Sequence, residues 1–180
     1  MTSMQVFIAV AAVLGFWVVG AYNRLVGLRN VISNAWTPVD EQLRRRSDLV
    51  ATMMSSLGVR APGERHAVEA ASAAQQQVLA AADTLGARPL QTAGAASLVA
   101  AEGVIGSALG RVRALVEADT ALRGDPEIGA LLREQEAVEL RLLMARQAFN
   151  DAVDTYNVAA RQFPTVLVAR LFGLRPAGKV

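Results

Sequence analysis

The feature that most constrains this chain is a run of residues near its start, from Met4 to Tyr22, that has no charged side chain. The run reads MQVFIAVAAVLGFWVVGAY. A helix of about 20 apolar residues spans the hydrocarbon core of a bilayer, which is roughly 30 Å thick. Trp17 and Tyr22 stand near its end, where aromatic rings favour the membrane interface. The run therefore predicts a transmembrane helix, and residues 1–23 a short outer N-terminus followed by that helix.

Two alternatives compete with a membrane span. A cleaved signal peptide normally begins with positive residues, which are absent here, although the small residues of VGA at 19–21 have the form of a cleavage site. A buried core helix is disfavoured, because the run is apolar around its whole circumference. The signal peptide stays open as an alternative.

The basic residues that flank the run predict its orientation. No Lys or Arg precedes it, whereas Arg24 and Arg29 follow at once and Arg44, Arg45 and Arg46 come soon after. Cytoplasmic flanks are enriched in Lys and Arg. We therefore expect a single-pass protein of the cell membrane, with the N-terminus outside, residues 24–180 in the cytoplasm and the lipid bilayer as a partner.

Beyond residue 23, apolar residues recur at intervals of three and four, which is the pattern of amphipathic helices. This spacing predicts helices over residues 24–58, 64–86, 90–122 and 126–163. The first helix could continue directly from the membrane span. Pro38 lies inside it, so we expect a bend between Asn34 and Pro38, or a break with Asn34 or Thr37 capping a new helix.

The predicted fold is all-α: an N-terminal transmembrane helix followed by an antiparallel up-down bundle of three to four long helices. Residues 24–163 form the cytoplasmic bundle. Residues 164–180 form an apolar tail, and in such a bundle the last helix returns towards the membrane. The tail segment TVLVARLFGLRP at 165–176 could therefore lie at the lipid interface or pack across the bundle.

The residue types that usually carry chemistry are sparse. The chain has no cysteine, and its one histidine, His66, has no second histidine with which to share a metal. No nucleophile stands beside a base in a pattern that can be read, and no phosphate-binding loop is present. The net charge is only +2, and the arginines are interspersed with acidic residues rather than with aromatic ones. The sequence predicts no enzyme, no cofactor, no metal and no nucleic-acid partner.

Some polar residues lie on or beside the apolar stripes, where they could form an interaction site or a buried polar network. Arg46 is the clearest, because it takes the place of an apolar residue and a buried charge must be paired. We expect an ion pair with Glu139 or Glu136 of the last helix; the alternative is a polar patch that binds a partner. The full candidate set, which includes one aromatic residue, is Asn34, Trp36, Asp40, Arg46, Asp48, Arg146, Asn150 and Asn157.

Several segments resemble the LemA family. They are YNRLVGLRNVISNAWTPVDEQLRRRSDLV at 22–50, ALGRVRALVEA at 108–118, ARQAFNDAVDTYN at 145–157 and FPTVLVARLFGL at 163–174. The resemblance implies an N-terminal membrane helix with a large cytoplasmic helical domain, and it implies no defined activity. The chain departs from the family pattern at Thr37-Pro38, where Ser-Gln is usual, and at Ala51, where proline is usual.

Two functions compete. The first is a membrane-anchored interaction or scaffold protein whose helices present long surfaces to an unidentified protein partner, or to further copies in a homo-oligomer joined through coiled-coil seams. The second is a membrane-tethered sensor that binds a small molecule or a lipid in or beside the bundle. The sensor should show an internal cavity lined by apolar side chains with a few polar groups.

Overall fold

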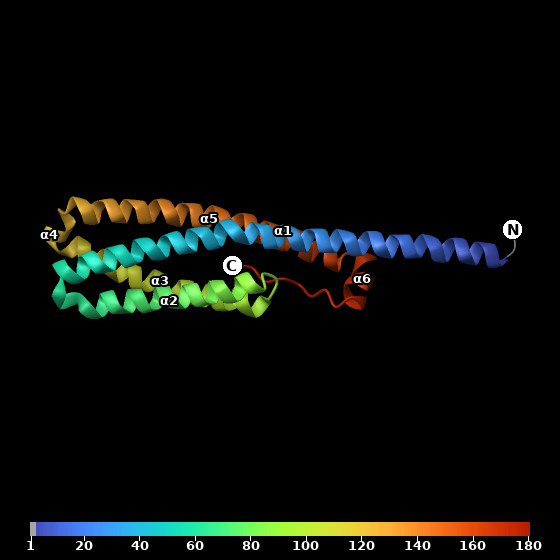
Figure 1. Cartoon of the computed structure of the whole chain (residues 1–180), viewed down its shortest axis with the longest axis horizontal. Helices are drawn as coiled ribbons and strands as arrows, with labels where there is room; N and C mark the ends of the chain where they lie inside the picture. Colours follow the sequence, from blue (N-terminus) through green and yellow to red (C-terminus); the bar gives the residue numbers. More distant parts are fainter. Residues whose placement is uncertain (1–2) are drawn as a thin grey trace.

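The computed structural model describes residues 3–180, and every regular element in that range is helical. The prediction of an all-α chain is confirmed. The first two residues of the predicted segment 1–23 lie outside the described range. Figure 1 shows a long bundle with one helix projecting far beyond it at the N-terminal end.

The projecting helix is α1, which runs from Ser3 to Arg60 without interruption. At 1.5 Å per residue its 58 residues extend over about 87 Å. Of the two alternatives predicted at Pro38, a bend or a break, the break is wrong, because α1 continues through this residue. Trp36 and Val39, on either side of Pro38, are both buried. Packing of the apolar stripe against the bundle therefore outweighs the hydrogen bond that proline removes.

The other long helices match the predicted segments closely. Helix α2 spans Arg65–Ala87 after the short 3-10 turn η1 at Pro62–Glu64, and α5 spans Pro126–Arg161. The predicted third helix over 90–122 is wrong in its last part, since α3 spans Thr92–Ala118 and a separate α4 spans Thr120–Arg123. The tail begins with α6, Thr165–Leu171.

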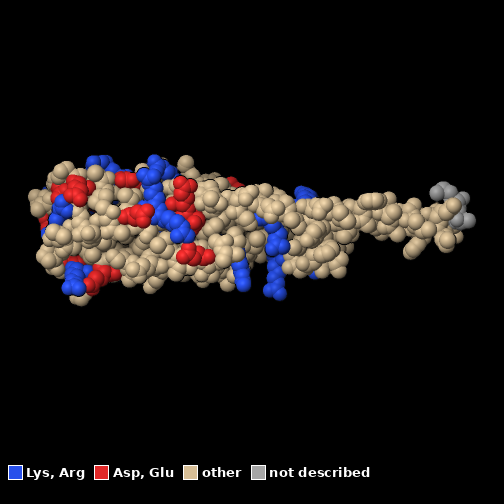
Figure 2. All heavy atoms as spheres, in the orientation of Figure 1, with Lys and Arg blue, Asp and Glu red and all other residues tan. Residues whose placement is uncertain are grey.

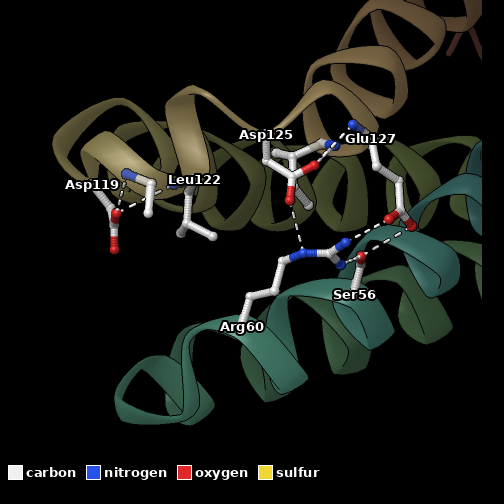
Figure 3. Close-up of polar contacts among 8 residues, drawn as sticks. Ser56, Arg60, Asp119, Leu122, Asp125 and Glu127 are labelled. Carbon is white, nitrogen blue, oxygen red and sulfur yellow. Dashed lines mark hydrogen bonds and ion pairs between the residues drawn. The ribbon is translucent and has the colours of Figure 1, made fainter.

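Aspartate caps account for the helix starts at the end of the bundle remote from the N-terminus (Figure 3). The Asp119 carboxylate accepts hydrogen bonds from the backbone N–H groups of Ala121 and Leu122, so a new helix begins there. Asp125 caps α5 in the same way and Pro126 follows it, as the sequence predicts. Arg60 at the end of α1 reaches the Asp125 carboxylate at 2.9 Å, which ties α1 to the start of α5.

The four long helices lie lengthwise beside one another, and the chain reverses direction at the turns after α1, α2 and α4 (Figure 1). Extensive backbone contact joins α1 to α5, α1 to α2, and α2 to α3. The large rings of the core meet between α1 and α5, where Trp36 packs edge-on against Phe149 with ring centroids 5.7 Å apart. Helix α1 is thus both the projecting rod and a central element of the bundle.

Candidate functional site: the seam between α3 and α5

The side of the bundle between α3 and α5 differs from the other three sides. The backbones of α3 and α5 make no extensive contact with one another within residues 3–180. Charged side chains and the C-terminal tail bridge them instead. We call this region the α3–α5 seam, and three parts of it follow one another along the bundle: the tail, a charge cluster and an open cavity.

The charge cluster occupies the middle of the seam and centres on Arg46 of α1, whose side chain is 2% exposed. Arg46 donates hydrogen bonds of 2.9 and 2.5 Å to the two carboxylate oxygens of Glu102 on α3. It also bonds Glu139 on α5 at 3.3 Å, so the predicted Arg46–Glu139 pair is confirmed. Arg146 of α5 lies 2.6 Å from Oε2 of Glu102, an oxygen that Arg46 also bonds. Figure 2 shows that basic and acidic side chains lie next to one another on the bundle, whereas the projecting end is almost free of charge.

The pKa of Glu102 reflects two opposing effects. Burial of this carboxyl group would raise its pKa, but the hydrogen bonds and charge of Arg46, together with the charge of Arg146, outweigh burial and hold the pKa below its ordinary value. Glu102 is therefore ionised at neutral pH. A buried guanidinium and a carboxylate in bidentate contact are mutually stabilised, and removal of either one would leave a costly unpaired charge.

A cavity of about 260 Å³ lies next to the cluster, further along the seam. Arg46, Glu102 and Glu139 form one side of it, and the helix wall of α3 contributes Gly106 and Gly110. A Cβ atom at either glycine would have no other atom within 4 Å, so the space beside them is open. The lining is mostly polar and charged, which suits a polar group rather than a lipid chain.

The third part of the seam is filled by the C-terminal tail, which two asparagines of α5 hold by its backbone. Asn157 accepts from the backbone N–H of Ala177 at 2.9 Å and donates to its carbonyl at 3.0 Å. Asn150 makes the same pair of bonds with Val180, at 2.9 and 2.7 Å. Asn150 and Asn157 are seven residues apart on α5, which is a rise of about 10.5 Å. Ala177 and Val180 are three residues apart in extended chain, which is about 10 Å. Each asparagine therefore faces its own residue of the tail.

The predicted candidate residues therefore do not form one site. Arg46 and Arg146 meet in the charge cluster, and Asn150 and Asn157 meet at the tail. Trp36 is part of the core, only 5% exposed. The other three candidates make none of the contacts described for the seam. Asp40 pairs with Arg44 at 2.9 Å, and Asn34 and Asp48 are exposed.

Three residues of the seam were missed by the sequence analysis. Glu102 had a signal, since it is the only charged residue between Thr92 and Gly110. Tyr156, whose hydroxyl donates to the carbonyl of Arg175 at 2.9 Å, looked like an ordinary core aromatic. Gly178 lies so close to Thr92 and Ala95 of α3 that a side chain would not fit there. Nothing in the local sequence indicates this close approach. Glu136, the other expected partner of Arg46, pairs with Arg113 instead.

Comparison with known proteins adds one positive finding. The model of the LemA family matches residues 35–179, a range that contains the charge cluster, the cavity and nearly all of the tail. No curated protein matches the chain. Since the match covers most of the sequence, the protein belongs to the LemA family.

Proposed function

We propose that the protein is a membrane-anchored helical scaffold, in which α1 crosses the bilayer and continues as a structural rod of the interaction domain. One observation carries this proposal. The most apolar 18-residue stretch of α1, near the N-terminus, has a mean hydropathy of 2.2. None of its residues is buried within the protein. Its large apolar side chains, among them Phe7 and Phe16, point outward. Such a surface is unfavourable in water and suits a lipid environment.

The continuity of α1 adds a mechanical argument. No loop separates the apolar part from the part that packs against α2 and α5. The bundle would therefore stand on the membrane at the angle of the helix rather than move freely on a linker. A second helix, α3, is also long and apolar enough to span a membrane by composition. We assign it to the bundle, because it packs on α2 and its Glu102 pairs with Arg46.

Helix α6 supports a second membrane contact. Phe163, Leu167 and Leu171 follow one another at intervals of four residues and are 77%, 55% and 75% exposed, and a patch of exposed apolar side chains marks a protein or membrane contact. The ring of Phe172, next to α6, lies 4.7 Å from that of Tyr22, near the end of the apolar run. In this proposal α6 rests at the lipid interface. Arg24 and Arg29, which follow the apolar run, favour a cytoplasmic bundle in this proposal, because cytoplasmic flanks are enriched in basic residues.

The surface offered to protein partners includes an exposed apolar patch on α5. Leu140, Leu143 and Met144 are each more than half exposed and stand one helical turn apart or adjacent. Apolar side chains in such a row are a common element of helix–helix interfaces. The proposal includes self-association and assigns no catalysis, no cofactor and no nucleic acid.

The sensor remains the second candidate, and the seam cavity is the observation in its favour. Its charged lining differs from the largely apolar cavity expected of a lipid sensor. A small polar molecule would be the matching ligand. We place this function second, because the cavity alone supports it, whereas exposed apolar side chains on three helices, α1, α5 and α6, support the scaffold.

The absence of cysteine allows a direct test. Single variants Ser3→Cys and Ser55→Cys, reconstituted in sealed vesicles, should react with a membrane-impermeant maleimide from opposite sides. Light scattering of the detergent-solubilised full-length protein should give the mass of a defined oligomer. Labelling of both positions from the same side would refute the membrane span. A monomer at all concentrations would refute self-association.

A further inference from the structure

Charge is distributed unevenly along the bundle. All 16 acidic residues fall within residues 40–83 and 102–154. The segments 3–39, 84–101 and 155–175 lie towards the end of the bundle from which α1 projects (Figure 1), and they contain six arginines and no acidic residue. None of these six arginines forms an ion pair within residues 3–180. This end therefore carries positive charge that the protein itself does not compensate.

Three of these arginines line one open pocket of about 720 Å³, which we call the arginine pocket. Arg29 comes from α1, Arg88 from the turn between α2 and α3, and Arg175 from the tail after α6. Segments far apart in the sequence thus bring three guanidinium groups to the wall of one pocket. No acidic residue is among the described residues that line it. Since like charges around one space repel each other, a bound anion would relieve the repulsion.

The start of α3 adds to this preference. Thr92 and Ala93, the first two residues of α3, also line the arginine pocket. The N-cap residue, Gln91, makes no side-chain hydrogen bond to the helix start. The first N–H groups of a helix favour a negative charge, so they supply further donors beside the arginines.

The donor set favours a phosphate group over other anions. A guanidinium group forms two parallel hydrogen bonds with a phosphate, and several arginines from different directions can each bond a different oxygen. The rest of the wall is largely apolar and includes Pro89, Leu90 and Pro176. A ligand that joins a phosphate to an apolar part therefore matches the pocket.

In the proposed orientation, the arginine pocket lies near the lipid headgroups. Arg29 is seven residues beyond Tyr22, the end of the apolar run, which is a rise of about 10 Å. The headgroup layer on each side of a bilayer is about 5–8 Å thick, so a long side chain at this position reaches it. On the tail, Arg175 follows Phe172 by three residues, and the ring of Phe172 lies 4.7 Å from that of Tyr22. Two separate segments therefore bring the pocket close to the headgroups.

We propose that the arginine pocket binds the phosphate group of an anionic phospholipid in the leaflet next to the bundle. The lipid joins α1, the turn between α2 and α3, and the tail, and it fixes the bundle against the membrane surface. Arginines just beyond a membrane span are attracted to anionic lipid in general, and the pocket adds a defined site to that attraction. This inference rests on the proposed function, because the membrane span brings the pocket to the bilayer.

Native mass spectrometry of the full-length protein in a neutral detergent tests the site, because it counts the lipids bound to each chain. With equal amounts of phosphatidylglycerol and phosphatidylcholine, we expect one phosphatidylglycerol per chain, in clear excess over phosphatidylcholine. Each of Arg29→Gln, Arg88→Gln and Arg175→Gln should lower this binding about 5-fold. Ala93→Glu should reduce it to the level of phosphatidylcholine, because it places a carboxylate in the pocket. This variant should still fold, since an acidic residue in the first turn of a helix is favourable.

Two matched controls separate the pocket from a general attraction to negative lipid. Arg170→Gln removes an exposed arginine from the same end of the bundle, and Ala96→Glu adds a carboxylate to an exposed position of α3. Neither residue lines the pocket, so both variants should bind phosphatidylglycerol as the natural chain does. Equal binding of the two lipids, or equal losses in the controls and in the pocket variants, overturns the proposal.

A soluble compound can supply the same phosphate group. Glycerol 3-phosphate at the concentration of the lipid should neither bind nor displace phosphatidylglycerol, because it lacks the apolar part. Displacement would show that the pocket takes a soluble phosphate, and it would overturn the assignment to lipid. The maleimide labelling described above tests the membrane span separately. Labelling from opposite sides without a preference for phosphatidylglycerol leaves the anchored scaffold standing and removes only the lipid site.

Discussion

Arg46 of α1 and Glu102 of α3 are joined by two parallel hydrogen bonds, although their helices are not neighbours in the bundle. Helix α1 packs on α2 and α5, and α3 packs on α2, so the pair crosses the interior of the bundle. The contact therefore contributes to closing the side on which α3 and α5 do not touch extensively. Its geometry leads to the first two predictions.

Loss of charge at Glu102 should cost far more stability than loss of charge at Glu139. Glu102→Gln leaves the guanidinium of Arg46, 2% exposed, without its bidentate partner, and we expect a loss of about 3 kcal/mol in the free energy of unfolding. Glu139→Gln removes a longer contact to a side chain that is 41% exposed, and it should cost about 1 kcal/mol or less. Urea unfolding in detergent, followed by circular dichroism, measures both. Equal losses would show that the cluster is not centred on Glu102.

The Arg46–Glu102 pair should make the free energy of unfolding depend on pH in the acidic range. The pKa of Glu102 is lower in the folded protein than its ordinary value of 4.5, so its contribution is fully present above pH 4.5 and is lost as pH falls through the folded pKa. The difference in unfolding free energy between the natural chain and Glu102→Gln should be constant above pH 4.5 and shrink below it. Taking this difference cancels the titration of the other carboxylates. A difference that grows in acid would contradict the lowered pKa.

The asparagine contacts should govern the order of the tail. Asn157→Ala removes both hydrogen bonds to Ala177, each worth about 1 kcal/mol. Because about 2 kcal/mol is lost in total, we expect the amide of Ala177 to exchange with deuterium roughly 30-fold faster. Asn34→Ala is the matched control, because Asn34 is exposed on α1. Equal effects of the two changes would show that the tail does not depend on this contact.

Two glycine substitutions should have opposite effects. Gly103 lies inside α3 with no other atom near a Cβ built there, so Gly103→Ala should raise the unfolding free energy by about 0.5–1 kcal/mol through helix propensity. Gly178→Ala places a methyl group against the backbone of Thr92 and should increase hydrogen exchange of the tail. Thermal unfolding and exchange mass spectrometry follow the two variants. Loss of stability in Gly103→Ala would indicate that the outer face of α3 is covered in the native assembly.

The sequence predicted some residues of the candidate site but not their main partners. The sequence indicated that Arg46 would need a carboxylate, because a charge in an apolar stripe must be paired. The sequence analysis expected this carboxylate on α5, whereas the main partner, Glu102, is on α3. The spacing of residues within α1 does not show which helix faces each residue of the apolar stripe. Asn150 and Asn157 stood out as polar residues beside a stripe, but their partners lie 20 to 30 residues further along the chain. No periodic pattern links an extended tail to a helix.

The sequence by itself determined the helical class, the exposed apolar run, the main turns and the Asp125 cap. These depend on local properties: the spacing of apolar residues, the absence of charge, and side chains that bond neighbouring backbone groups. The tertiary structure alone decided that α1 continues through Pro38, that Glu102 is the main partner of Arg46, and that the tail fills the α3–α5 seam. Each of these depends on how distant segments pack, where burial of apolar surface and pairing of charge outweigh local preference.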